Sequence, residues 1–319
     1  MQAAPLDLPP LRGRLLREAP LAAQTWFRVG GPAEALARPA DADDLAQFLQ
    51  ALPPELPVIA VGAASNLIVR DGGVPGVVVR LGGRGFGAVT AEPDGVVAGA
   101  AALDATVAEH ALAAGLAGLE FLSGIPGTVG GAVAMNAGAY GGDVAACLDW
   151  AEVATRGGEL VRVPASALSL SYRTARLPPG GVVVRARFRA RPGDPAAIAA
   201  RMAEIRASRE ATQPVRARTG GSTFRNPEGH RAWELIAQAG GRGLALGGAQ
   251  CSEKHCNFLL NLGGATASDL EALGEELRRR VRAMCGVQLE WEIKRLGVPG
   301  TQGSTQGGSM QGSDTRIAA

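Results

Sequence analysis

The chain has 319 residues, 46% of them hydrophobic, which is enough for a large core and favours about two domains. Its formal net charge of +2 is too small to indicate a nucleic-acid partner, so none is expected. Its 45 glycines, about twice the usual ~7%, occur in clusters, which favours loops whose backbone approaches a ligand closely.

Neither a disulfide framework nor a membrane anchor is expected. The four cysteines are scattered, as in a reduced cytosolic protein, and Cys251 and Cys256 lack a second pair at zinc-like spacing, so no metal site is predicted. The N-terminus has no long apolar run of the kind found in signal peptides. The uncharged segment 121–142 is long enough to span a bilayer, but its seven glycines favour a loop. We therefore predict a cytoplasmic protein with no membrane association and no obligate protein partner.

The first third of the chain is predicted to form short strands and one helix. The first ~20 residues are expected to be poorly anchored. Asp41 or Asp43 is expected to cap a short helix that carries Leu45, Phe48 and Leu49 on its apolar side. Strand-like runs are predicted at 57–61, 76–81, 87–92 and 95–101, and the stretch GAASN at 62–66 is predicted to be a turn.

The middle of the chain alternates between helices and strands. A helix is predicted from about Asp104 to Ala114, and strands are predicted at 148–155, 160–164 and 184–190. Three arginines on one face of the last strand are interpreted as solvated. Asp194 and Pro195 then open a helix, and the arginine-rich stretch 206–218 is interpreted as a domain boundary.

The C-terminal third is predicted to contain two helices and two strands. A helix at 231–239 precedes a strand at 257–262. A capping box at 268–271 is expected to start a helix whose apolar stripe consists of Leu270, Leu273, Leu277, Val281 and Met284. Residues 287–294 alternate between apolar and polar, which predicts a strand with Glu290 and Glu292 on one face. The Gly/Ser/Gln-rich residues 298–319 are expected to be disordered.

Short strands, clustered glycines and a few helices predict an α+β fold with more than one sheet. No GxxxxGK[ST] loop is present, so P-loop chemistry is not expected. The stretch 83–88 matches G-x-G-x-x-A but precedes strand-like residues, so we interpret the match as chance. Two glycine-rich stretches, 62–66 and 123–142, contain small polar side chains and expose backbone N–H groups that favour a pyrophosphate. They predict a dinucleotide site rather than ordinary surface loops.

Three side chains have two possible interpretations each. Ser222, in GGSTFRNP, is either a turn residue or a proton donor. Arg173 follows Tyr172 and is either a surface ion-pair residue or a bidentate ligand for a carboxylate. Glu292 lies either on a solvated strand face or in a pocket that raises its pKa, and Glu290 is equally open to both roles.

The order of seven motifs resembles that of the bacterial UDP-N-acetylenolpyruvoylglucosamine reductases, from about residue 25 to residue 296. The motifs are TWFRVGGPAE (25–34), VGAASNLIVRDGG (61–73), GLEFLSGIPGTVGGAVAMNAGAYG (118–141), LSYRTARL (170–177), GGSTFRNP (220–227), GGAQCSEKHCNFLLNLGGATASDL (247–270) and LEWEIKRLG (289–297). The resemblance is to the shorter branch of the family, which lacks an extra substrate-capping loop. It implies bound FAD, NADPH as reductant, and reduction of UDP-N-acetylglucosamine enolpyruvate to UDP-N-acetylmuramate for peptidoglycan.

The resemblance also implies the site residues. Hydride would reach the vinyl carbon from the flavin, Arg173 and Glu292 would stabilise the enolate, and Ser222 would donate the proton. The UDP-sugar would be bound by Tyr172, Arg225 and Asn226. The cofactor would be held by Val61, Gly62, Ala63, Ala64, Ser65, Asn66, Gly124, Ile125, Pro126, Gly127, Thr128, Gly130, Gly131, Ala132, Asn136, Gly138, Ala139 and Tyr140. Where the family commonly has Gly-x-Gly-Ser-Asn this chain has Ala64, which we expect in an ordinary backbone conformation.

The implied architecture is a two-part FAD-binding region of the vanillyl-alcohol-oxidase-like type plus a smaller α+β substrate-binding domain. The expected divisions are 1–82 completed by 286–297, then 83–205, 206–285 and a tail at 298–319. Two alternatives remain open from the residues alone. One is an FAD oxidase or dehydrogenase that acts on a small alcohol, and the other is a non-catalytic nucleotide-binding module.

Overall fold

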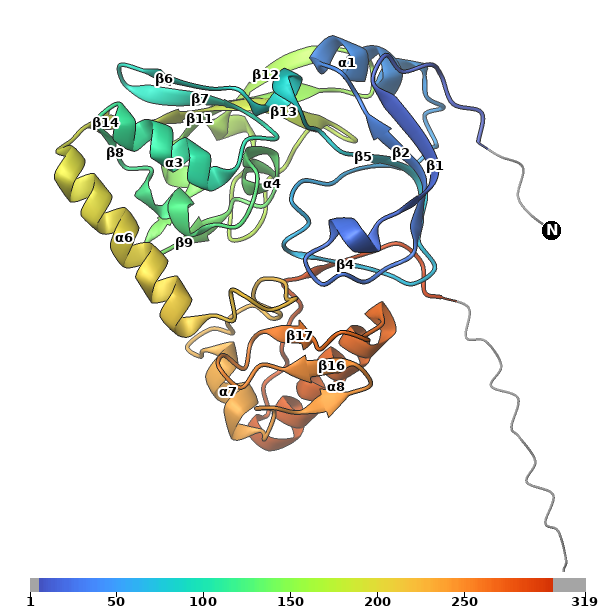
Figure 1. Ribbon diagram of the computed structural model, residues 1–319, viewed down its shortest axis with the longest axis vertical. Coiled ribbons are helices and arrows are strands. Elements are labelled where there is room, and N and C mark those ends of the chain that lie inside the picture. The colour runs from blue at the N-terminus through green and yellow to red at the C-terminus, as the bar shows by residue number, and fades with distance from the viewer. Residues whose placement is uncertain (1–5, 301–319) are drawn as a thin grey trace, which may run out of the picture.

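A computed structural model describes residues 6–300, in three packed parts (Figure 1). The first part is a four-stranded sheet of order β1-β2-β5-β3. Strand β1 (Arg14–Pro20) is antiparallel to β2 (Pro32–Arg38), whereas β2 and β3 (Val58–Ala60) are both parallel to β5 (Val74–Val79). The expectation of a poorly anchored start is therefore wrong for residues 14–20, because they pair with β2. Residues 1–5 lie outside the described range.

Helix α1 (Ala42–Ala51) starts at Asp41, whose side chain accepts from the backbone N–H of Asp44 at 2.9 Å. This settles the choice between the two predicted caps. The apolar side of the helix packs against β5 of the first sheet and against the second sheet, so one core joins both parts.

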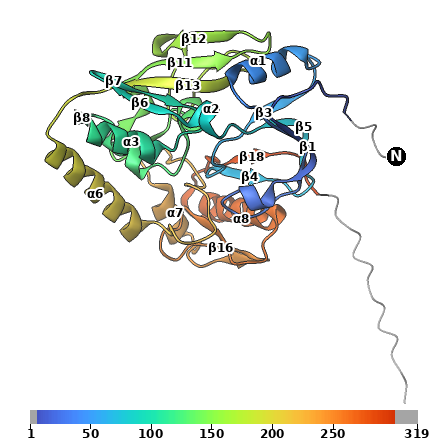
Figure 2. The same ribbon diagram turned by 45° about the horizontal axis from the view of Figure 1, so that its top comes forward.

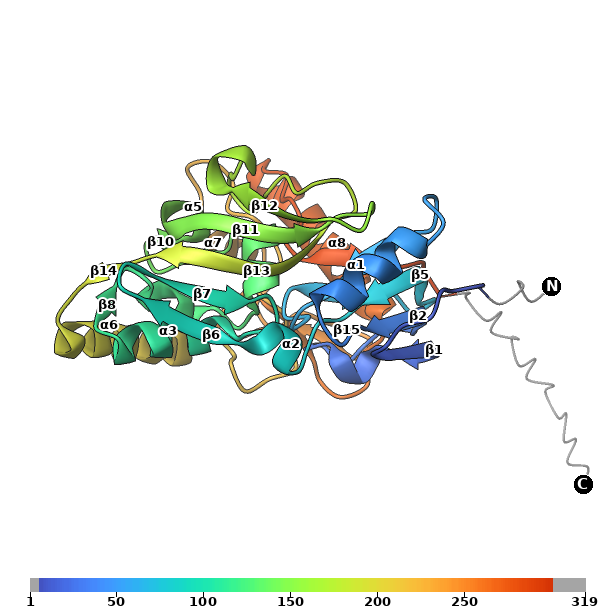
Figure 3. The ribbon, with the colours of Figure 1, turned by 90° about the horizontal axis from the view of Figure 1, so that it is seen from above.

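The second part is a five-stranded antiparallel sheet of order β12-β11-β13-β7-β6. Its strands are β6 (Val89–Glu92), β7 (Gly95–Gly99), β11 (Leu148–Ala154), β12 (Leu160–Pro164) and β13 (Val182–Arg189). Helices α3 (Asp104–Ala113) and α4 (Val129–Ala134) pack against β7, as Figure 3 shows for α3. Of the three β13 arginines predicted to be solvated, Arg185 and Arg189 are exposed, at 48% and 53%. Arg187 is less solvated than predicted, because it is 14% exposed and forms ion pairs with Glu92, Asp94 and Asp149.

Helix α6 (Pro195–Thr212) connects the second part to the third along one side of the molecule (Figures 1 and 2). Asp194 caps it and Pro195 occupies its first turn, as predicted. Its apolar side buries Ile198, Met202 and Ile205. The helix continues unbroken across residue 206, where the sequence predicted a domain boundary, so the domain division stays a proposal.

The third part packs α7 (Ala232–Gln238) and α8 (Ala267–Cys285) with a three-stranded sheet. Its strands are β15 (Ala245–Leu246), β16 (Ala249–Cys251) and β17 (Leu259–Asn261). The predicted capping box is wrong in register, because Thr266 is the N-cap and exchanges hydrogen bonds with Asp269. Met284 is 66% exposed, since it lies beyond the covered part of the stripe.

The predicted strand at 287–294 is mostly irregular. Only β18 (Lys294–Leu296) is regular, and it pairs in parallel with β4 (Leu67–Val69), far away in sequence. The alternation is broken because Glu292 and Ile293 are both buried. Glu290 is exposed, so the two carboxylates differ in environment instead of sharing one face.

Short elements connect these parts. They are η1 (Ala22–Gln24), α2 (Arg84–Gly87), β8 (Leu116–Ala117), η2 (Glu120–Gly124), β9 (Gly138–Ala139), β10 (Gly142–Asp143), α5 (Val144–Cys147), η3 (Ala165–Ala167) and β14 (Arg191–Pro192). In the predicted tail, Val298 exchanges backbone hydrogen bonds with residues 72 and 73, so it is ordered, while 301–319 lie outside the described residues. No helix described between residues 6 and 300 has the length and apolar character to cross a bilayer.

Candidate active site

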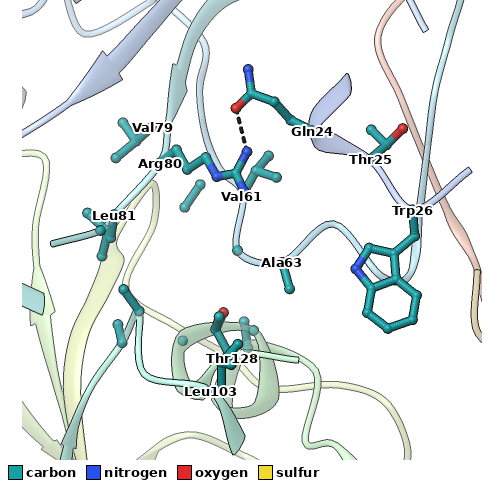
Figure 4. Close-up of a pocket in the computed structure, with 18 of the residues that line it drawn as sticks. Gln24, Thr25, Trp26, Val61, Ala63, Val79, Arg80, Leu81, Leu103 and Thr128 are labelled. Atoms are coloured by element: carbon teal, nitrogen blue, oxygen red, sulfur yellow. Dashed lines mark hydrogen bonds between the residues drawn. The ribbon is translucent and has the colours of Figure 1, made fainter. Parts of the chain in front are cut away.

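A cavity of about 750 Å³ lies between the first and second parts, within the size range of small-molecule sites. Its walls include Val61, Gly62 and Ala63 after β3, Arg80 after β5, and Thr128 before α4 (Figure 4). Residues of the first part and of the second part therefore share one cavity, as the predicted two-part cofactor region requires.

The cavity wall is cationic. Of the residues that the structure describes, four arginines line it, namely Arg28, Arg80, Arg216 and Arg218, and no aspartate or glutamate does. The rest of the lining is mainly apolar and glycine-rich. This composition fits a large ligand with an apolar ring system and a negatively charged link.

Glycine is required where the two cradle segments approach one another. A Cβ added to Gly62 would lie 2.3 Å from the Thr128 hydroxyl oxygen, too close for any other residue without movement. That hydroxyl is buried and has no hydrogen-bond partner among the described residues. It can therefore donate to an acceptor in the cavity.

Ala64 departs from the expected backbone conformation. Its φ is +53°, in the left-handed region that favours glycine, so the turn has the same sense of bend as Gly-x-Gly would produce. The alanine is held there by its surroundings, since it is 6% exposed and its carbonyl accepts from the backbone N–H of Trp26. Such a conformation costs about 1–2 kcal/mol.

The cavity accounts for part of the predicted cofactor set. Of the eighteen residues, those that line it are Val61, Gly62, Ala63, Thr128, Gly130 and Gly131. The sequence interpretation missed Gly82, Gly83 and Gly87, which also line it. The G-x-G-x-x-A stretch is thus at the cavity, although only one turn of helix (α2) follows Gly83, not the long helix of a dinucleotide fingerprint.

A second polar cluster surrounds Glu292. Its carboxylate accepts from Arg173 Nε at 2.8 Å and from the Tyr172 hydroxyl at 3.3 Å. The Glu292 side chain is only 9% exposed. Partial burial raises the pKa of Tyr172, and the charge of Glu292 raises it further. Glu292 is buried and Glu290 is exposed, so burial distinguishes two glutamates that the strand pattern left equivalent.

Backbone hydrogen bonds bring the Ser222 segment to this cluster. The N–H of Glu292 donates to the carbonyl of Thr223 at 2.8 Å, and the N–H of Gly221 donates to the carbonyl of Ser65 at 3.0 Å. Asn66 Nδ2 donates to the carbonyl of Glu292 at 3.3 Å. Three segments far apart in sequence therefore meet beside the turn 62–66.

The Arg173 loop is held in an uncommon conformation. Arg173 has φ of +54°, and Asn136 has φ of +42°. The Asn136 amide nitrogen donates to the carbonyl of Ser171 at 2.9 Å, while its oxygen accepts from the N–H of Ala145 at 2.8 Å. This buried amide therefore fixes the loop that carries Tyr172 and Arg173. Strain of this kind is often found where a side chain is held ready for a ligand.

Tyr140 packs its ring over Gly124, where an added Cβ would lie 2.6 Å from the ring. Its hydroxyl is buried without a hydrogen-bond partner among the described residues, and burial raises its pKa. Neither residue lines the 750 Å³ cavity. The two predicted cofactor residues therefore lie in a neighbouring packed region.

Arg225 and Asn226, the two remaining predicted substrate residues, differ in which of their side-chain atoms are already hydrogen-bonded. The Asn226 side-chain oxygen accepts from the N–H of Ala232 at 3.0 Å and so holds the start of α7. Arg225 Nε is buried and has no partner among the described residues. In the same range, no three His, Cys, Asp or Glu side chains form a group that could hold a metal ion.

Comparison with known proteins identifies relatives over most of the chain. Residues 213–296 match the family model for the C-terminal domain of UDP-N-acetylenolpyruvoylglucosamine reductase, and residues 33–164 match the model for an FAD binding domain. The UDP-N-acetylenolpyruvoylglucosamine reductase of Acidiphilium cryptum is 68% identical over 94% of this chain and 98% of its own length. That of Granulibacter bethesdensis is 68% identical over 91% and 93%.

A solved structure shows the same fold. The crystal structure of UDP-N-acetylenolpyruvylglucosamine reductase from Thermus caldophilus aligns with a TM-score of 0.75 and 38% sequence identity. The alignment covers 89% of this chain and 99% of the other. The α+β fold with an FAD-binding region followed by a smaller domain is confirmed.

Proposed function

This chain belongs to the UDP-N-acetylenolpyruvoylglucosamine reductase family, and from this premise we propose how its own residues carry out the reaction. It is a flavoenzyme that reduces UDP-N-acetylglucosamine enolpyruvate to UDP-N-acetylmuramate, with FAD as cofactor and NADPH as reductant, in peptidoglycan precursor synthesis. This family membership replaces the two alternatives, an alcohol oxidase or dehydrogenase and a non-catalytic module.

The cationic, glycine-lined cavity fits FAD. Gly62, Ala63 and the Thr128 hydroxyl would hold the anionic link, with the remaining predicted residues of 61–66 and 124–140 around them. When bound, FAD supplies a hydride, received from NADPH, to the vinyl carbon of the substrate. The protein must then stabilise the charge that develops on the substrate and deliver one proton.

Arg173 and Glu292 are suited to the developing enolate. A guanidinium is a planar, cationic fork, and the 2.8 Å hydrogen bond from Arg173 Nε to Glu292 leaves the Nη groups of Arg173 for a substrate carboxylate. Glu292 is buried, which keeps most water from its carboxyl group, and we assign it a hydrogen bond to the enol oxygen that forms on the substrate. Each residue thus acts on charge that is present mainly in the transition state.

Ser222 is the proposed proton donor to the substrate carbon. A serine hydroxyl is a poor acid, so donation requires that the alkoxide be stabilised by nearby positive charge. Arg173 and Arg225 belong to the segments that meet around Tyr172 and Glu292, and both influence the Tyr172 hydroxyl. Tyr172, Arg225 and the Asn226 amide nitrogen are proposed to bind the UDP-sugar.

One observation supports this assignment above all others. Glu292 joins the Ser222 segment through its backbone N–H and joins Arg173 through its carboxylate. The segments that carry the three proposed catalytic side chains are more than 45 residues apart in sequence, so the contacts of Glu292 with the other two segments have no local cause.

Separate measurement of the two half-reactions tests the role of Ser222. In Ser222→Ala, flavin bleaching by NADPH should keep its wild-type rate, whereas recovery of colour with the enolpyruvyl substrate should slow by about 10²–10⁴-fold. Ser166→Ala, an exposed serine on η3, is the control and should change neither rate. Equal slowing of both half-reactions in Ser222→Ala would contradict the proton-donor role.

The division into 1–82 with 286–297, 83–205 and 206–285 is kept as part of this proposal, as is a cytoplasmic location. The location is supported by the cysteines, since all four are free. Limited proteolysis that cuts at the proposed boundaries, with the fragments identified by mass, would test the division.

A further inference from the structure

Arg80 stands out among the four arginines of the cavity. Arg216 is 89% exposed and forms an ion pair with Glu210, and Arg28 and Arg218 are exposed to solvent. Arg80, which follows β5, is only partly exposed, and its backbone is fixed by a hydrogen bond from its N–H to the carbonyl of Ala37. Its charge is therefore the least hydrated of the four.

No carboxylate compensates this charge within the described residues. Arg80 takes part in no ion pair, and its Nη1 donates to the side-chain oxygen of Gln24 (Figure 4). Arg38 Nη2 donates to the same oxygen at 3.0 Å. The side-chain nitrogen of Gln24 donates to the carbonyl of Pro20, and this hydrogen bond orients the Gln24 oxygen toward the two arginines. Two guanidinium groups thus converge on one neutral acceptor.

This arrangement is unfavourable in the protein alone. Burial lowers the pKa of Arg80, and the nearby positive charge of Arg38 lowers it further. A partly buried charge without a counter-ion is costly, and two like charges that share one acceptor add repulsion. A ligand that brings negative charge into the cavity would remove both penalties.

The position of Arg80 selects the part of the ligand that it would meet. The N–H of Val61, which precedes the turn 62–66, donates to the carbonyl of Val79 at 2.9 Å. Arg80 is the residue after Val79, so it lies beside the start of this turn. Figure 4 shows Arg80 beside Val61 and above Ala63. The free N–H groups of that turn are the proposed pyrophosphate cradle.

We propose that Arg80 is the counter-charge for the FAD pyrophosphate, and that Gln24 holds its guanidinium toward the cavity. The proposal rests on the proposed position of the cofactor cradle. Arg38 shares the acceptor but does not line the cavity and is exposed, so it helps to orient the amide and has no contact with the cofactor.

Binding of FAD and of riboflavin, which lacks the phosphates, to cofactor-free protein tests the proposal. Fluorescence titration of Arg80→Met should give an FAD dissociation constant about 10–100-fold above wild type, the loss expected for a charge-assisted hydrogen bond. The riboflavin dissociation constant should stay within about twofold. Added KCl should weaken FAD binding by wild type more than by the variant.

Two further variants and one stability measurement complete the test. Arg38→Met should keep wild-type FAD affinity, and Arg80→Lys, which keeps the charge, should retain most of it and its salt dependence. Cofactor-free Arg80→Met should melt at the wild-type temperature or above, because the uncompensated charge is gone. Unchanged FAD affinity in Arg80→Met, or equal weakening of FAD and riboflavin, would overturn the proposal. A wild-type protein that binds neither ligand would instead contradict the proposed cradle.

Discussion

Replacement of Asp104 by asparagine should stabilise this protein, although the aspartate is completely buried. Asp104 is the first residue of α3 and is 0% exposed, and neither carboxylate oxygen has a hydrogen-bond partner among the described residues. It lies under the 124–128 loop, where a Cβ added to Gly127 would come within 2.6 Å of Oδ2. Burial raises its pKa from 3.8 to about 8.

The sign and the size of the effect follow from this shift. The folded state favours the protonated carboxyl, so the stabilisation is fully present below pH 3.8 and is lost as the pH rises toward 8. A pH of 7 is about three units above 3.8, the pKa of this aspartate in the unfolded chain. At 1.36 kcal/mol per unit, the loss is about 4 kcal/mol, an upper bound because the site can relax. Asparagine has nearly the same shape but no proton to lose.

Urea unfolding of the cofactor-free protein between pH 5 and pH 8 provides the assay. The free energy of unfolding of Asp104→Asn, minus that of wild type, should grow by about 1.4 kcal/mol per pH unit up to about pH 8. Asp43→Asn is the control, because Asp43 is also in the first turn of a helix but is exposed. A difference that is constant with pH, or equal slopes in both variants, would refute the idea that Asp104 is buried without a partner.

Two backbone predictions concern the segments around the site. Ala64→Gly should raise the free energy of unfolding by up to about 1 kcal/mol, since the left-handed conformation at φ +53° costs alanine more than glycine loses in entropy; a drop in urea midpoint would contradict this. Gly274→Ala should lower the free energy of unfolding by about 1–3 kcal/mol, because the new Cβ would lie 2.1 Å from the Trp291 ring. That ring packs against Phe224, which is two residues after Ser222. An unchanged thermal midpoint in Gly274→Ala would show that the indole can move aside.

Local sequence patterns were enough for many individual elements. Asp194 and Pro195 open α6, and the pattern narrowed the cap of α1 to Asp41 or Asp43, because capping depends on residues a few positions apart. The glycine clusters also indicated a dinucleotide, which the FAD-binding match bears out, since close backbone approach to a phosphate needs residues without a Cβ. The start of α8 shows the limit, because the sequence pattern placed the cap at Ser268 whereas the structure has it at Thr266.

Tertiary structure alone decided which polar groups are buried and which of them meet. The alternating pattern at 287–294 made Glu290 and Glu292 equivalent, and the fold buries only Glu292, against an arginine 119 residues earlier in the chain. Arg80 and Asp104 carry no sequence signal, and neither has a counter-charge within residues 6–300 because of what surrounds them in space. A periodic pattern records the environment of one element, whereas the cost of a buried charge depends on every segment packed around it.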